Sequence, residues 1–121
     1  MKKLVIFSLL IAGTAWGQSV EEQKACYGQA AKVVNKNIQS FNNHYDAHTK
    51  TCWVEEFNND HPTHNAPTYT RIVYNAFEHQ GTDASFIGEL GKKPTFCWVG
   101  DKECRSINEF DMLVSQRYGL K

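Results

Sequence analysis

Apolar residues recur every three or four positions in the first third of the chain, which is the spacing of one helix face. Ser19 and Glu22 precede this stretch as a capping box, in which each side chain can bond the other residue's backbone N–H. Asn42-Asn43 follows the stretch and is expected to end the helix. We therefore predict a helix over residues 20–41, with Cys26 at the border of this apolar face: Tyr27, Ala30, Ala31, Val34, Ile38 and Phe41.

Between residues 50 and 99 the apolar residues alternate with their neighbours, as they do in strands. The pattern predicts strands over Lys50–Phe57, Thr68–Glu78, Ala84–Leu90 and Thr95–Val99. The second of these strands carries bulky apolar residues on both faces, so we expect it in the middle of a sheet. Because the connections are short, neighbouring strands should be antiparallel.

A second helix is predicted near the end of the chain. Ser106 and Glu109 form another capping box, apolar residues follow at helical spacing, and Gly119 is a natural stop. Amphipathic helices need an apolar sheet face to cover. We therefore predict one α+β domain, in which an antiparallel sheet of four to five strands has both helices packed on one face.

The first 17 residues have the pattern of a secretory signal peptide. Two lysines precede the apolar run Leu4–Ala12, which is shorter than the ~20 residues needed to span a membrane. Ala15 and Gly17 supply the small residues that signal peptidase accepts. We expect cleavage after Gly17, export to the periplasm or the medium, and a mature domain of residues 18–121.

The expected mature chain is close to neutral. Removal of Lys2 and Lys3 leaves 11 of the 13 Lys and Arg residues against 13 Asp and Glu, a formal net charge of −2 with His neutral. Nucleic acids and anionic membranes attract strongly basic surfaces. We therefore expect no nucleic-acid partner and no insertion of the mature chain into a membrane.

All four cysteines, Cys26, Cys52, Cys97 and Cys104, lie in the mature part. An even number in an exported chain predicts two disulfides, and the spacing is wider than the two to four residues usual between zinc ligands. A hairpin centred between residues 100 and 101 places Cys97 opposite Cys104, which leaves Cys26 for Cys52. A bulge at Gly100 would instead allow Cys26 to reach Cys97 or Cys104.

Candidate metal ligands occur in two places. Asp60, His61 and His64 share a polar loop, where two imidazoles and a carboxylate could hold zinc or copper. His44 and His48 are four residues apart but follow the predicted end of the helix. We expect the histidines to be structural or solvated, with no resident metal and no cofactor.

The sequence has few candidates for catalysis. Glu78, at the end of the predicted central strand, is the candidate general base. Glu55 and Glu56 are neighbours on a strand, so they should point to opposite faces and cannot form a carboxylate pair. The sequence lacks the common nucleophile, phosphate-loop and calcium-loop motifs.

Aromatic residues are more numerous than one face of a small sheet requires, with seven Phe, five Tyr and three Trp. Trp53, Tyr69 and Trp98 are the candidates for an exposed binding surface, and the alternative is that they belong to the core.

A set of short motifs spans most of the mature chain: His44-Tyr45, Cys52-Trp53-Val54, Ala76-Phe77-Glu78, Cys97-x-Val99, Cys104, Glu109-Phe110 and Leu113-Val114. This set resembles small exported bacterial proteins that carry four cysteines and whose function is uncharacterised. The resemblance implies a single exported domain and supplies no activity.

Two interpretations of function follow. The first is a non-enzymatic exported domain that binds an extracytoplasmic protein or envelope component, as an inhibitor or accessory protein. The second is a small hydrolase or metal-dependent enzyme that uses the loop with Asp60, His61 and His64, or Glu78. A pocket that gathers those groups would favour the enzyme, and an exposed aromatic patch would favour the binding domain.

Overall fold

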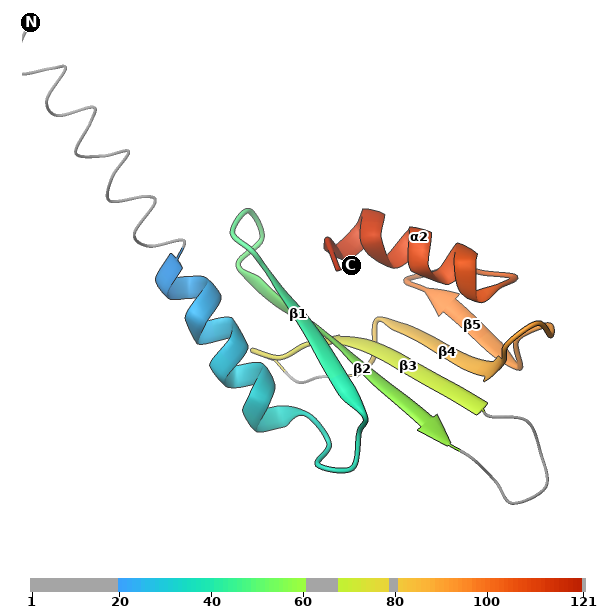
Figure 1. Ribbon diagram of the computed structural model, residues 1–121. Helices are drawn as coiled ribbons and strands as arrows, with labels where there is room; N and C mark the ends of the chain where they lie inside the picture. Colours follow the sequence, from blue (N-terminus) through green and yellow to red (C-terminus); the bar gives the residue numbers. More distant parts are fainter. Residues whose placement is uncertain (1–19, 61–67, 79–80, 121) are drawn as a thin grey trace, which may run out of the picture.

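Six strands form one antiparallel sheet, and they follow the order of the chain from one edge to the other (Figure 1). The computed structural model describes residues 20–60, 68–78 and 81–120. A helix over residues 20–33 precedes the sheet, and α2 (Ile107–Tyr118) follows it. The strands are β1 (Ser40–Asp46), β2 (Thr51–Asp60), β3 (Thr68–Asn75), β4 (Ala84–Glu89), β5 (Phe96–Val99) and β6 (Lys102–Glu103).

The predicted α+β class and the antiparallel sheet are confirmed, and the predicted Thr68–Glu78 strand is central, as β3. The sheet has six strands and not four to five, because β1 was not predicted. β6 is the short second strand of the predicted hairpin at residues 100–101. The predicted signal peptide over residues 1–17, the capping residue Ser19, and His61 and His64 lie outside the described residues.

The first helix is shorter than predicted, because it ends at residue 33 instead of residue 41. β-branched residues and asparagine weaken a helix, and Val33-Val34-Asn35 combines both. The Asn35 side chain accepts a hydrogen bond from the backbone N–H of Asn37 at 3.0 Å, which forms a turn in place of another helical one. Asn42 and Asn43 therefore lie in β1 and do not end the helix.

The two helices lie on opposite faces of the sheet, which corrects the prediction that both cover one face. On β3, Val73 packs in the core beneath α2, whereas its neighbour Tyr74 packs in the core beneath the helix 20–33. On β2, Trp53 packs against the core beneath α2, and its neighbour Val54 packs in the core beneath the helix 20–33. Since these strands carry apolar side chains on both faces, each face requires a cover.

The larger core lies beneath α2. Phe110, Val114 and Tyr118 of this helix are at most 2% exposed, and they form one cluster with residues of β3, β4 and β5. Ser106 caps the helix by accepting from the N–H of Glu109 at 3.1 Å, as the capping box predicts. Gly119 ends the helix in the left-handed region, with φ 71°, as predicted.

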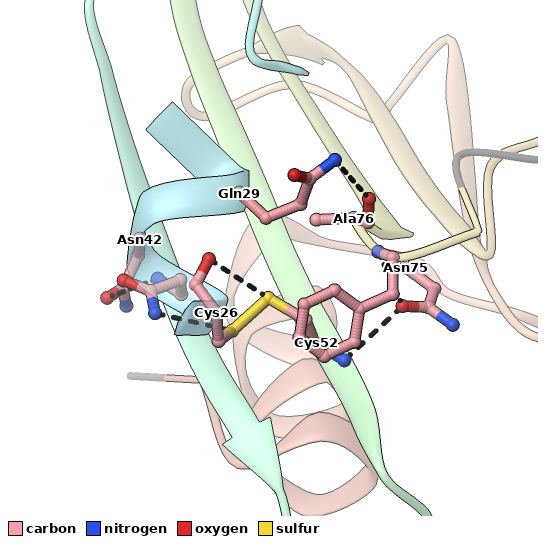
Figure 2. The surroundings of a disulfide bond; sticks show 8 residues. Cys26, Gln29, Asn42, Cys52, Asn75 and Ala76 are labelled. Atoms are coloured by element: carbon pink, nitrogen blue, oxygen red, sulfur yellow. Dashed lines mark hydrogen bonds between the residues drawn. A yellow bond between two sulfur atoms is a disulfide. The ribbon is translucent and has the colours of Figure 1, made fainter. Parts of the chain in front are cut away.

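Both predicted disulfides are present. Figure 2 shows Cys26–Cys52 between the helix 20–33 and β2, where the two Cα atoms are 5.3 Å apart. Cys97–Cys104 closes the hairpin after β5, and the pairing of Trp98 with Glu103 confirms the predicted register. Disulfides are typical of proteins that reside in oxidising compartments, so the two disulfides indicate an extracytoplasmic environment. Within the described ranges, the helices are too short or too polar to cross a membrane.

Candidate functional site

The three aromatic residues predicted as a binding surface do not share one face. Trp53 and Tyr69 are half-buried on the α2 face, where the Trp53 ring lies 4.5 Å from that of Tyr118. Trp98 lies on the opposite face, because its neighbours Cys97 and Val99 point into the core beneath α2. The structure therefore separates Trp98 from the other two, which belong to the margin of the core.

Trp98 lies in an exposed apolar patch that the helix 20–33 does not cover. Cross-strand pairing aligns Ile87 of β4 with Phe96 of β5, and the Phe96 and Trp98 rings are 6.4 Å apart. Ile87, Phe96 and Trp98 are 37%, 44% and 36% exposed, high fractions for large apolar side chains. We call these three residues the open face.

Polar groups surround the open face. Ser85 pairs with Trp98, and a hollow of about 390 Å³ is lined by Thr82, Ser85, Phe96 and Trp98 among others. Glu103 is the partner of Trp98 on β6, so its carboxylate belongs to the same side of the sheet. The open face thus has an apolar centre with hydroxyl groups and a carboxylate at its margin.

A second pocket lies on the same side of the sheet and adjoins the open face through Ile72, which pairs with Ser85. We call it the Glu56 pocket. Its volume is about 360 Å³, and it is lined by Val33, Asn35, Glu56, Ile72, Tyr74, Gly81 and Thr82.

The polar centre of this pocket is a carboxylate and a phenol. The Tyr74 hydroxyl donates to Glu56 Oε2 at 2.5 Å, and the two residues are 5% and 8% exposed. Burial, together with the neighbouring Glu56 carboxylate, raises the pKa of Tyr74 well above its usual range. The phenol therefore stays protonated and acts as the donor to Glu56.

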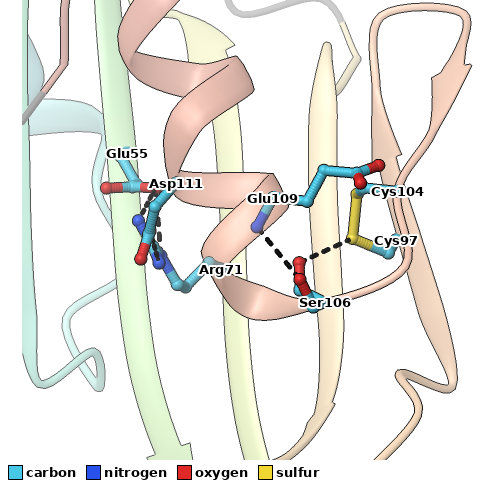
Figure 3. A network of polar contacts seen from close by, with 7 residues as sticks. All are labelled: Glu55, Arg71, Cys97, Cys104, Ser106, Glu109 and Asp111. Atoms are coloured by element: carbon cyan, nitrogen blue, oxygen red, sulfur yellow. Dashed lines mark hydrogen bonds and ion pairs between the residues drawn. A yellow bond between two sulfur atoms is a disulfide. The ribbon is translucent and has the colours of Figure 1, made fainter.

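On the α2 face, the neighbouring carboxylate of Glu55 has a cationic partner. Arg71 donates to Glu55 Oε2 from both Nη2, at 2.7 Å, and Nε, at 3.1 Å, and it also pairs with Asp111 of α2 (Figure 3). The guanidinium lies over the Phe110 ring, 4.9 Å from the ring centre. Burial raises the pKa of Glu55, and Asp111 adds to that effect, whereas Arg71 opposes it. As predicted, Glu55 and Glu56 point to opposite faces.

The candidates for metal binding are not gathered in the described part of the chain. His44 lies in β1, and its ring is so close to Gly119 that a Cβ added to this glycine would lie 2.9 Å from the ring. His48 is exposed after β1. Asp60 is the last residue of β2, and its predicted companions His61 and His64 lie outside the described residues. The described residues hold no group of three or more His, Cys, Asp or Glu suited to a metal ion.

The candidate general base, Glu78, is not at the end of the central strand. β3 ends at Asn75, and Glu78 is exposed in the turn that follows. It lines a hollow of about 320 Å³ together with Asn75 and Asp83.

Glu56, Tyr74 and Arg71 were not predicted as site residues. The available signal was a pair of glutamates in the middle of a strand with apolar neighbours, a position where a charged side chain is costly without a partner. The partners are supplied by β3, and their identity depends on the register of β2 and β3.

Searches of protein-family models, curated proteins and solved structures gave no match to this chain.

Proposed function

We propose that this protein is an exported binding domain that docks another extracytoplasmic protein on its open face. The observation that carries the proposal is the exposure of Ile87, Phe96 and Trp98 side by side on β4 and β5. Contiguous exposed apolar residues mark interaction surfaces in soluble proteins. Aromatic residues are enriched at protein interfaces and often carry much of the binding free energy.

The chemistry of the surface favours a partner segment that is apolar and basic. Ile87 adds an aliphatic side chain to the two rings, which suits apolar side chains. Two carboxylates lie near the surface, Glu103 beside Trp98 and Glu56 in the adjoining pocket. Glu89, on the same side of β4 as Ile87, is already paired with Lys92. A partner that places Lys or Arg beside its apolar residues would match both features.

Export is part of this proposal. The two disulfides support an oxidising compartment, and the start of the sequence has the pattern of a signal peptide. Intact mass of the protein recovered from the envelope or the medium tests it. We expect a chain that begins at Gln18, and a mass that retains residues 1–17 would contradict export.

Photocrosslinking tests the docking surface. A photoreactive phenylalanine analogue at position 96 should crosslink one extracytoplasmic protein in the source cells, whereas the same analogue at Met112 should not. Met112 is a matched control, because it is 50% exposed but lies on α2, across the sheet from the open face. The crosslinked protein is then purified, and its affinity for the unmodified domain is measured by calorimetry.

We expect Trp98→Ser to weaken that affinity about 30-fold, the effect of losing about 2 kcal/mol at an aromatic interface residue. Met112→Ser should leave the affinity unchanged. Equal crosslinking from positions 96 and 112, or full affinity in a folded Trp98→Ser variant, would overturn the proposal. Crosslinks only to a second copy of this chain would also overturn it, since the open face would then be a dimer interface.

A further inference from the structure

Within the described part of the chain, the Glu56 carboxylate differs from that of Glu55 in having no cationic partner. Among the residues that the structure describes, no Lys, Arg or His forms an ion pair with Glu56, although the side chain is more than nine-tenths buried. Removing a charge from water costs several kcal/mol unless an opposite charge and hydrogen bonds compensate. The Tyr74 hydroxyl supplies one hydrogen bond of this compensation.

The Glu56 carboxylate can also accept further hydrogen bonds. Its two oxygens offer about four lone-pair sites, and a phenol fills one of them. The surrounding wall is mixed, with aliphatic groups from Val33 and Ile72 and polar groups from Asn35 and Thr82. An ammonium or guanidinium group on an aliphatic stem would match this wall, because it provides several N–H donors, a positive charge and an apolar stem.

We infer that the Glu56 pocket is a binding site for an alkylammonium or guanidinium group, held by a charge-assisted hydrogen bond to Glu56. The pocket volume of about 360 Å³ lies at the small end of the range for ligand sites, which suits one such group. Two sources can supply the cation: a free small molecule, or a side chain of the docked protein. Only the second source rests on the proposed function.

A titration followed by amide chemical shifts tests the inference. L-arginine amide, added to the isotope-labelled protein, should produce saturable shifts at Glu56, Ile72 and Thr82, with a dissociation constant on the order of 1 mM, as expected for a contact worth about 4 kcal/mol. L-citrulline amide has a similar shape without the side-chain charge, so it should bind at least about tenfold more weakly.

Two substitutions on β2 provide the matched comparison. Glu56→Gln should weaken binding of L-arginine amide at least about tenfold, whereas Glu55→Gln, one residue away on the opposite face, should leave it unchanged. Equal binding of the two amides, or full binding by a folded Glu56→Gln variant, would overturn the inference. If Glu56→Gln does not fold, the comparison of the two amides on the unmodified protein still decides.

The purified crosslinked partner then identifies the source of the cation. A tenfold loss of partner affinity in Glu56→Gln would assign the cation to a partner side chain, and unchanged affinity with lost binding of L-arginine amide would assign it to a small molecule. Photocrosslinking at position 96 does not depend on Glu56, so failure of the docking proposal and failure of this inference give different results.

Discussion

The two helices are attached to the sheet by different means. α2 inserts three large side chains, Phe110, Val114 and Tyr118, into the core on its face. The helix 20–33 fully buries only small side chains, Cys26 and Ala30, while its Tyr27 is 58% exposed. α2 is therefore held mainly by apolar burial, and the first helix is held largely by the Cys26–Cys52 disulfide.

The same difference extends to the carboxylates and aromatic residues of the two faces. Beneath α2, Glu55 is neutralised by Arg71, and Trp53 packs against Tyr118. On the other face, Glu56 has a phenol but no cation among the described residues, and Phe96 and Trp98 remain exposed. The face where Glu55 and Trp53 have these partners contributes stability. The face where Glu56 lacks a cation among the described residues, and where Phe96 and Trp98 stay exposed, has the features of a surface that receives a ligand.

Truncating one aromatic residue in each helix should give the largest contrast. Phe110→Ala should lower the free energy of unfolding by about 4 kcal/mol, because it opens a cavity in the core beneath α2. Tyr27→Ala should cost about 0.5 kcal/mol or less, as is usual for exposed positions. Urea unfolding measures both values, and similar costs would contradict the asymmetry between the helices.

The two disulfides should differ in the same sense. In the chain-entropy model, loops of roughly 27 and 8 residues correspond to about 3.5 and 2.5 kcal/mol. Replacing both Cys26 and Cys52 by Ala should therefore cost about 1 kcal/mol more than replacing both Cys97 and Cys104.

Hydrogen exchange gives a local test of the same comparison. Without Cys26–Cys52, amides in residues 20–33 should exchange faster while those of α2 keep their protection. Equal loss of protection in the two helices would show that the first helix does not depend on its disulfide.

Much of the fold could be predicted because local signals and tertiary structure agree. Strands β2 to β5 follow from alternation, α2 follows from its capping box and its glycine stop, and the Cys97–Cys104 pair follows from the hairpin register. β1 was missed because Ile38 and Phe41 continue the helical spacing of the preceding apolar residues, and because Asn42-Asn43 was interpreted as the end of that helix.

The arrangement of the helices and the site was harder to predict, because it depends on which face each side chain occupies. Apolar residues on both faces of β3 were correctly interpreted as a central strand, but they also require a helix on each side, which was not recognised. The contrast between Glu55 and Glu56 depends on their β3 partners, Arg71 and Tyr74, which only the strand register identifies.

The last prediction concerns the ion pair beneath α2. Arg71→Met keeps an apolar stem over Phe110 but leaves Glu55 without its cation. We expect a loss of about 3 kcal/mol near neutral pH, the lower end of the range for breaking a buried pair. The double variant Arg71→Met with Glu55→Gln should recover much of this loss, because it no longer buries an unpaired charge. Urea unfolding of both variants measures the difference.

The stability cost of Arg71→Met should depend on pH. The pKa of Glu55 is already raised in the folded protein, so its contribution to stability is largest below the usual glutamate value of 4.5 and decreases as pH rises through the folded value. In Arg71→Met the opposing effect of the guanidinium is gone, and the folded pKa of Glu55 should rise further. The cost of Arg71→Met should therefore be small at about pH 4, where Glu55 is largely protonated in both proteins, and grow toward neutral pH. A cost that stays constant over this range would mean that Arg71 stabilises the protein through its contact with Phe110 and not through the charge of Glu55.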